Sequence, residues 1–258
     1  ADKNEGSDTP AWYMDSYGWG QVNYIHEHPK PTTVKFQQNE YIKNEFEKLE
    51  VSASQGNRSI TTGYPSVIDI PSFVDFMILN EFASNADGYQ FSTFFHKDRN
   101  GKLRAGPIWD FNLTFGNDLF QWGFDRSKTY LWQFEYENMG TKFWTDLFND
   151  SVFKCYLTKR WKELIAPGMP LNSYAISNLI DTTKTLISEA ATRQELLSGT
   201  TGQFEDQISG LKSFIFERIS WISGQLSDTS LCDNVSTPPL FNSKINYHPL
   251  VQEDQDSS

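Results

Sequence analysis

Residues 80–117 constrain the fold of this chain more than any other stretch, because two acidic clusters flank a predicted β-hairpin there. The first cluster contains Asp87 and the second contains Asp110. Residues 98–101 read Asp-Arg-Asn-Gly, and an Asn-Gly pair between two strand-like runs is typical of a tight hairpin turn. A hairpin of this length brings together the residues that precede and follow it, so we expect Asp87 and Asp110 to share one pocket.

Six helices are predicted around this hairpin, whose strands we place at 89–97 and 102–109. Apolar residues recur at helical spacing, and Asp69 and Pro71 have the residue types of a helix N-cap and of a first helical turn. The predicted helices cover residues 37–51, 69–84, 142–149, 151–165, 172–197 and 203–226. The sequence therefore predicts an α+β fold that is mostly helical, with a central β-hairpin or small sheet that carries the site.

The composition argues against two classes of partner. The formal charge is −11 and the isoelectric point is near 4.8, whereas a general binder of nucleic acid or of anionic membranes needs clustered Lys and Arg. No apolar run approaches the roughly 18 residues that a membrane-spanning helix requires. We therefore expect neither a nucleic-acid partner nor a membrane span.

Two smaller features leave alternatives open. Cys155 and Cys232 have no metal-ligand spacing, and the sequence is compatible with one disulfide or with two free thiols. His26 and His28 alternate as a metal-binding pair would, but no third ligand is apparent, so we interpret them as surface residues.

The two acidic clusters have the residue types of a phosphoryl-transfer site. Asp87 follows a predicted helix in a turn, where a carboxylate can project into a cleft and accept a proton from a hydroxyl. Asp110 and Asn112 supply oxygen atoms that suit a hard cation such as Mg²⁺, which takes its other ligands from water and phosphates. A base on one loop and a metal-holding acid after the next hairpin is the layout of kinases. The alternative is that these residues only form turns and helix caps.

The same stretch resembles the signature region of the spore coat protein H (CotH) kinase family of bacteria. Sequences of that family have a helix ending in Asn-Glu, an Asn-x-Asp turn, a hairpin with a Gly-Lys turn, and a Pro-x-Trp-Asp segment that closes on Phe-Gly. The matching residues are Asn80, Glu81, Asn85, Asp87, Gly101, Lys102, Pro107, Trp109, Asp110, Asn112, Phe115 and Gly116. The resemblance covers residues 29–226 and includes Lys159-Arg160-Trp161 and Glu217-Arg218-Ile219-Ser220-Trp221.

This resemblance implies an atypical protein kinase that transfers a phosphoryl group from ATP to Ser or Thr of secreted or coat proteins, with Mg²⁺ or Mn²⁺. Asp87 would be the catalytic acid/base, supported by Asn85. Asp110 would hold the metal, with Asn112 as a second ligand, and Glu81 would hold the loop from the end of its helix. Family members are commonly exported or surface-associated, so an extracellular or cell-surface location is implied as well.

We divide the chain into an irregular N-terminal segment (1–28), a domain resembling the C-lobe of a CotH kinase (29–228) and a polar C-terminal extension (229–258). The residues ahead of position 69 are too few for a kinase N-lobe, and they contain no Gly-x-Gly-x-x-Gly loop. We therefore expect this chain to be the C-terminal part of a longer kinase and to be inactive alone.

Two other functions fit parts of the sequence. A loop at 118–140 is rich in aromatic residues that could bind a protein or glycan partner on a non-catalytic kinase-like scaffold: Phe120, Trp122, Phe124, Tyr130, Trp132, Phe134 and Tyr136. We favour the alternative that these rings cap the core beneath the loop. Asp87 and Asp110 could also serve as the paired carboxylates of a hydrolase, although Asn112 suits a metal better.

Overall fold

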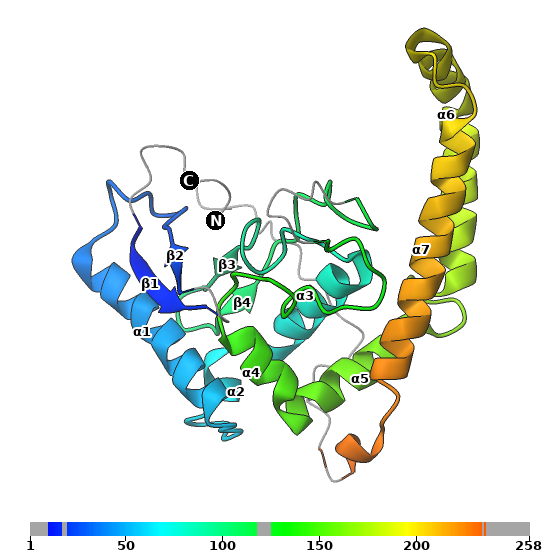
Figure 1. Ribbon diagram of the computed structural model, residues 1–258. Helices are drawn as coiled ribbons and strands as arrows, with labels where there is room; N and C mark the ends of the chain where they lie inside the picture. The colour runs from blue at the N-terminus through cyan, green and yellow to red at the C-terminus, as the bar shows by residue number, and fades with distance from the viewer. Residues whose placement is uncertain (1–9, 17–19, 118–124, 234, 236–258) are drawn as a thin grey trace, which may run out of the picture.

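Most of the chain is helical in the computed structural model of Figure 1, which describes residues 10–16, 20–117, 125–233 and 235. The helices are α1 (Phe36–Ser54), α2 (Tyr64–Val67), α3 (Ile70–Ala83), α4 (Phe143–Asn149), α5 (Ser151–Ile165), α6 (Ser173–Ser198) and α7 (Gln203–Gln225), followed by the 3₁₀ helix η1 (Ser230–Cys232). With two small two-stranded sheets, they confirm the predicted, mostly helical α+β fold. None of the helices in the described ranges is long and apolar enough to cross a bilayer.

The N-terminal segment contains a β-hairpin where the sequence predicted irregular structure. Its strands, β1 (Trp12–Asp15) and β2 (Gln21–Tyr24), pair antiparallel with Trp12 opposite Tyr24. Along β1, Trp12 and Met14 are buried while the residues between and after them are exposed, which is the alternation of a strand with one face on the core. The rings of Trp12 and Tyr24 stack with their centroids 5.3 Å apart and so fix the register.

The predicted central hairpin is much shorter than expected. Its strands are β3 (Phe95–His96) and β4 (Arg104–Ala105), and the predicted turn is present, since the Gly101 N–H donates to the Asp98 carbonyl at 3.0 Å. The prediction of strands over 89–97 and 102–109 is therefore correct for these four residues and wrong for the others. The ladder stops after β4 because Gly106 has φ +117° and Pro107 has no N–H to donate.

Helix α3 lies at the centre of the fold and buries apolar residues on several faces. Its buried residues include Phe73, Phe76 and Met77, and the ring of Trp144 from α4 packs 5.2 Å from that of Phe76. Asp69 occupies the N-cap position as predicted, but its carboxylate pairs with Arg104 of β4 at 2.9 Å instead of capping the helix. This ion pair ties the small hairpin to the start of α3.

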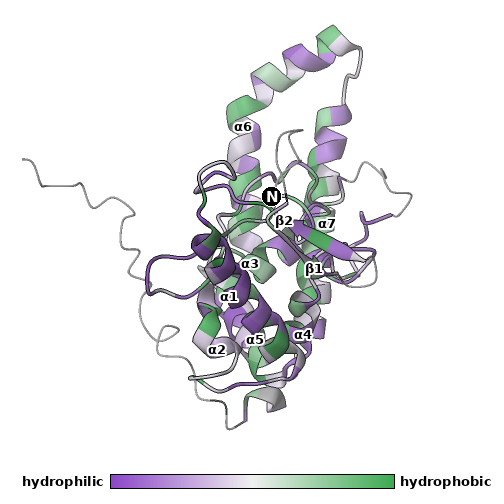
Figure 2. Ribbon diagram, turned by 90° about the vertical axis from the view of Figure 1, so that its left-hand side faces the viewer, coloured by the Kyte–Doolittle hydropathy of each residue, from purple (hydrophilic) through white to green (hydrophobic). Residues whose placement is uncertain are grey.

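Helices α6 and α7 run antiparallel to each other and project from the rest of the molecule (Figure 1). Ion pairs join them from Lys184 to Glu205 at 2.5 Å and from Asp181 to Lys212 at 2.6 Å. Ile176 is the buried residue of α6, so most of that helix is exposed, although hydrophobic residues recur along it (Figure 2). We call this pair of helices the arm.

Cys155 of α5 and Cys232 of η1 form a disulfide, which decides between the two thiol states that the sequence allowed. Replacing both with alanine is expected to lower the free energy of unfolding by about 2–4 kcal/mol, because the cross-link restricts the unfolded chain. Urea unfolding of C155A/C232A and of the wild type, each with and without dithiothreitol, measures this. Equal midpoints for the oxidised wild type and the double variant would contradict it.

Candidate functional site

Asp87 lies in a tight turn directly after α3. The helix ends at Ser84, which has φ +51°, and Asn85 is buried with its Nδ2 donating to Asn80 Oδ1 at 2.9 Å. Asn85 Oδ1 accepts the Asp87 N–H at 3.2 Å, which is the hydrogen bond of an Asx turn. Asp87 itself is partly exposed. The predicted supporting residue Asn85 therefore holds the turn from inside the fold and is not in a position to meet a substrate.

Gly88 allows this turn to approach α3 closely. A Cβ at position 88 would lie 2.7 Å from Asn80 Oδ1, the same oxygen that accepts from Asn85. Asn138 holds the other side of the turn, because its Nδ2 donates to the Gly88 carbonyl at 2.9 Å. Two buried amide side chains thus fix the main chain on either side of Asp87.

Asp110 and Asn112 lie on a second loop, after β4. Asp110 is partly exposed, has φ +59°, and its Oδ2 accepts from Ser92 Oγ at 3.2 Å. A left-handed backbone is tolerated better by Asp and Asn than by most residues. Asn112 is exposed.

Main-chain hydrogen bonds join the two loops. The Ala86 N–H donates to the Leu113 carbonyl at 3.1 Å, and the Phe115 N–H donates to the Ala83 carbonyl at 2.6 Å. The first of these bonds joins the residue before Asp87 to the third residue after Asp110. The loops are therefore neighbours, and this pairing rather than a long hairpin brings them together. That Asp87 and Asp110 share one pocket stays a prediction.

The donor set of these loops fits a magnesium-type ion. Within the described residues, no group of three or more His, Cys, Asp or Glu side chains could hold a metal alone. Asp110 and Asn112 offer one carboxylate and one amide, which is what Mg²⁺ or Mn²⁺ needs when water and phosphate supply the other ligands. The Nε2 atom of His26 is already engaged in a hydrogen bond with Asn39 Oδ1, at 2.8 Å, so it is not a free metal ligand.

A cavity of about 800 Å³ is lined by residues that are close in sequence to the two loops. It is enclosed by the N-terminal hairpin, by α1 and by the segment from Tyr89 to Pro107, and its aromatic lining includes Trp12, Tyr24, Tyr41, Phe46, Phe94 and Phe95. Gln90 and Pro107, which also line it, are three residues from Asp87 and Asp110 respectively. This cavity could not be predicted from the sequence, because its walls come from segments far apart in the chain.

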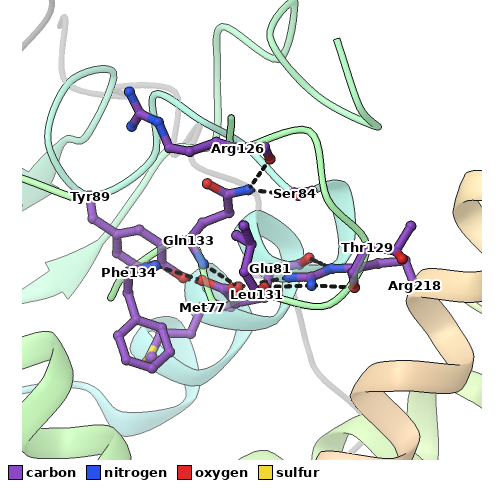
Figure 3. Close-up of polar contacts among 10 residues, drawn as sticks. All are labelled: Met77, Glu81, Ser84, Tyr89, Arg126, Thr129, Leu131, Gln133, Phe134 and Arg218. Carbon is purple, nitrogen blue, oxygen red and sulfur yellow. Dashed lines mark hydrogen bonds and ion pairs between the residues drawn. The ribbon is translucent and has the colours of Figure 1, made fainter. Parts of the chain in front are cut away.

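A buried ion pair links α3 to α7 (Figure 3). Arg218 is fully buried, and its Nη2 lies 2.9 Å from Oε2 of Glu81, which is 3% exposed. The Glu81 carboxylate also accepts the N–H groups of Gln133 at 2.9 Å and Phe134 at 3.1 Å. Burial raises the pKa of Glu81, and Arg218 and these two N–H groups counter part of that shift.

Hydrogen bonds extend from this ion pair to the residue before Asp87. Gln133 Nε2 donates to Ser84 Oγ at 2.7 Å and to the Arg126 carbonyl at 2.9 Å, as Figure 3 shows. Arg126 Nη1 in turn donates to the Ala86 carbonyl at 2.8 Å. The predicted site residues did not include these groups. Arg218 had a recognisable signal, since it lies between Ile215 and Ile222 on the buried face of α7, where a charge needs a partner.

The aromatic loop at 118–140 is largely part of the core where it is described. Phe120, Trp122 and Phe124 lie outside the described residues. Trp132 packs 4.7 Å from Trp221, and Phe134 packs 4.7 Å from Phe148, between ring centroids. Tyr130 and Tyr136 are exposed. The rings at 132 and 134 thus cap the core, which weakens the case for a binding surface built on this loop.

The close approach at Gly88 is testable by substitution. Gly88→Ala is expected to destabilise the protein by about 1–3 kcal/mol, because the added methyl group displaces Asn80 from Asn85. Gly210→Ala is the matched control: it lies inside α7 with open space around it, and should stabilise by up to about 1 kcal/mol. Urea unfolding measures both. Equal shifts for the two variants would refute a special role for position 88.

The family of the chain follows from comparison with known proteins. Residues 8–222 match the family model described as CotH kinase protein. No curated protein matches the chain at a significant level. The family match covers far more than half of the sequence and includes the N-terminal hairpin, both loops and Arg218, so this chain belongs to the CotH kinase protein family.

Proposed function

We propose that this chain catalyses phosphoryl transfer from ATP to a Ser or Thr hydroxyl of a protein, with Mg²⁺ or Mn²⁺. This departs from the expectation, drawn from the sequence, that the chain is inactive alone, because its N-terminal hairpin and α1 line a cavity large enough for a nucleotide. The observation that carries the proposal is the main-chain pairing of Ala86 with Leu113 and of Phe115 with Ala83. It keeps the loops of Asp87 and Asp110 side by side, and Gln90 and Pro107, each three residues from one of these aspartates, line a cavity large enough for a nucleotide.

Each loop takes one part of the reaction. Asp87, on a turn held by buried amides, accepts the proton of the attacking hydroxyl. Asp110 is the metal ligand, with Asn112 as a second oxygen donor on the same loop. A bound divalent ion neutralises charge on the phosphate oxygens. Asn85 contributes by fixing the main chain of Asp87.

The cavity is the proposed site of the adenosine group. Its volume of about 800 Å³ lies within the range of sites for small ligands. Aromatic walls suit a flat heterocycle, and Asn23, Gln38 and Gln90 provide polar groups in the same lining. Pro107, on the segment that leads to Asp110, lines the same cavity, so Asp110 would be the residue to hold the metal that binds the phosphates.

The acceptor is proposed to be a secreted or surface protein. The disulfide between Cys155 and Cys232 supports this location, because disulfides persist mainly outside the reducing cytoplasm. Family membership supports a protein acceptor in the same way.

Substitution of each aspartate separates the two roles. Asp87→Asn is expected to lower phosphate transfer at least about 100-fold with little change in ATP binding, since it removes only the proton acceptor. Asp110→Asn is expected to weaken Mn²⁺-dependent ATP binding about tenfold or more. Labelled ATP and a Ser/Thr-rich acceptor report transfer, and titration calorimetry reports binding without any turnover.

The matched control for both variants is Asp206→Asn, an exposed position on α7. It should behave as the wild type in both measurements. Wild-type levels of transfer in Asp87→Asn, or of metal-dependent binding in Asp110→Asn, would rule out the assigned role.

Filling the cavity tests where the nucleotide lies. Val34 is partly buried and lines the cavity, so Val34→Trp should occupy the space of the base and raise the Kd of ATP about tenfold or more. Leu186→Trp, at an exposed position of α6, is the control and should leave the Kd unchanged. Calorimetry with ATP and Mn²⁺ measures both. An unchanged Kd in Val34→Trp would exclude this cavity as the nucleotide site.

A further inference from the structure

Arg218 is a cation in a place where the rest of its helix is apolar. It is fully buried at the base of the arm, between Ile215 and Ile222 on the face of α7 that meets the core. A lone buried charge is strongly unfavourable, so the groups around it define what it holds in place. Those groups come from two separate segments of the chain, the end of α3 and the loop at 129–131.

The guanidinium binds the end of α3 in two ways. Its Nε donates to the Glu81 carbonyl at 2.7 Å and its Nη2 to the Glu81 carboxylate at 2.9 Å. The Glu81 carbonyl, in the last turn of α3, also accepts the Ser84 N–H at 3.1 Å, so Arg218 adds a second donor to it one turn before Asn85. The end of α3 is therefore fixed to α7 through both the main chain and the side chain of Glu81.

The same guanidinium also holds the loop that crosses above α3. Its Nη1 donates to the carbonyls of Thr129 at 2.8 Å and Leu131 at 2.6 Å (Figure 3). That loop continues into Gln133, which bonds to Ser84, and it begins with Arg126, which bonds to the Ala86 carbonyl. Arg218 is thus connected by an unbroken series of hydrogen bonds to the residue that precedes Asp87.

We propose that Arg218 is a positioning residue for phosphoryl transfer: it holds the Asp87 turn, and through Ala86 and Leu113 the Asp110 loop, in register. This inference rests on the proposed function for its catalytic part. The planar fork of arginine is essential to it, because three of its nitrogens bond at fixed directions to separate partners. Lysine retains the charge and cannot reproduce that geometry.

The pair of Arg160 and Asp75 provides the matched control. It also joins an arginine to α3, with Arg160 Nε donating to Asp75 Oδ1 at 2.8 Å and Nη2 to Oδ2 at 3.2 Å. Asp75 lies in the first half of α3, away from the helix end that carries Asp87. Arg160→Lys weakens an ion pair of the same type and leaves the contacts of Glu81 intact.

The test compares Arg218→Lys with Arg160→Lys in the full chain, by amide hydrogen exchange of peptides covering residues 84–92 and 110–117. We expect exchange in these peptides to rise about tenfold in Arg218→Lys and to stay at the wild-type rate in Arg160→Lys. In transfer assays, the kcat of Arg218→Lys should fall about 10–100-fold while the KM for ATP changes less than about twofold.

The outcomes are distinguishable. Equal exchange in both lysine variants, or a change in KM without a change in kcat, would overturn the role of Arg218. If Arg218→Lys does not fold, Glu81→Gln keeps the side-chain shape and is expected to raise exchange in the same peptides. If the wild type transfers no phosphate with either metal, the proposed function fails, and the exchange rates still decide whether Arg218 holds the Asp87 turn.

Discussion

The buried ion pair of Glu81 and Arg218 is the interaction on which the arrangement of both loops depends. Removing one partner of a buried pair typically costs about 3–5 kcal/mol, because the other charge is left without compensation. Such a pair adds little net stability over a well-packed apolar pair, so its value is in specifying one geometry. Here it specifies how the C-terminal end of α3 meets the loop around Gln133.

The helices could be predicted from the sequence because their apolar residues repeat at helical spacing, and the bounds of α5 agree with the prediction at both ends. That Asp87 and Asp110 lie in loops could be predicted from the residue types around them. The contacts that join the two loops could not be predicted, because main-chain hydrogen bonds such as the one from Ala86 to Leu113 do not depend on the pattern of side chains. The prediction of longer strands was wrong because of the Gly106-Pro107 pair, a local feature that the spacing of apolar residues does not reveal.

The N-terminal hairpin is a second element that could not be predicted from the sequence. Each strand is four residues long, too short for a clear alternation, and its stability comes from contacts to distant residues, among them Tyr24 with Phe46 of α1. The cavity depends on these contacts. The family match begins at residue 8, ahead of this hairpin, so it includes the hairpin.

The length of the arm and the geometry of the Asp87 turn can vary independently, although such properties are usually linked in a small protein. Arg218 lies near its base, whereas its far end is a turn with Gly199 and Gly202 at positive φ and open space around both. Lengthening or shortening α6 and α7 by equal whole turns near that end would leave every contact of Arg218 unchanged. The reach of the arm from the body is therefore a dimension that can vary without altering the geometry around Asp87.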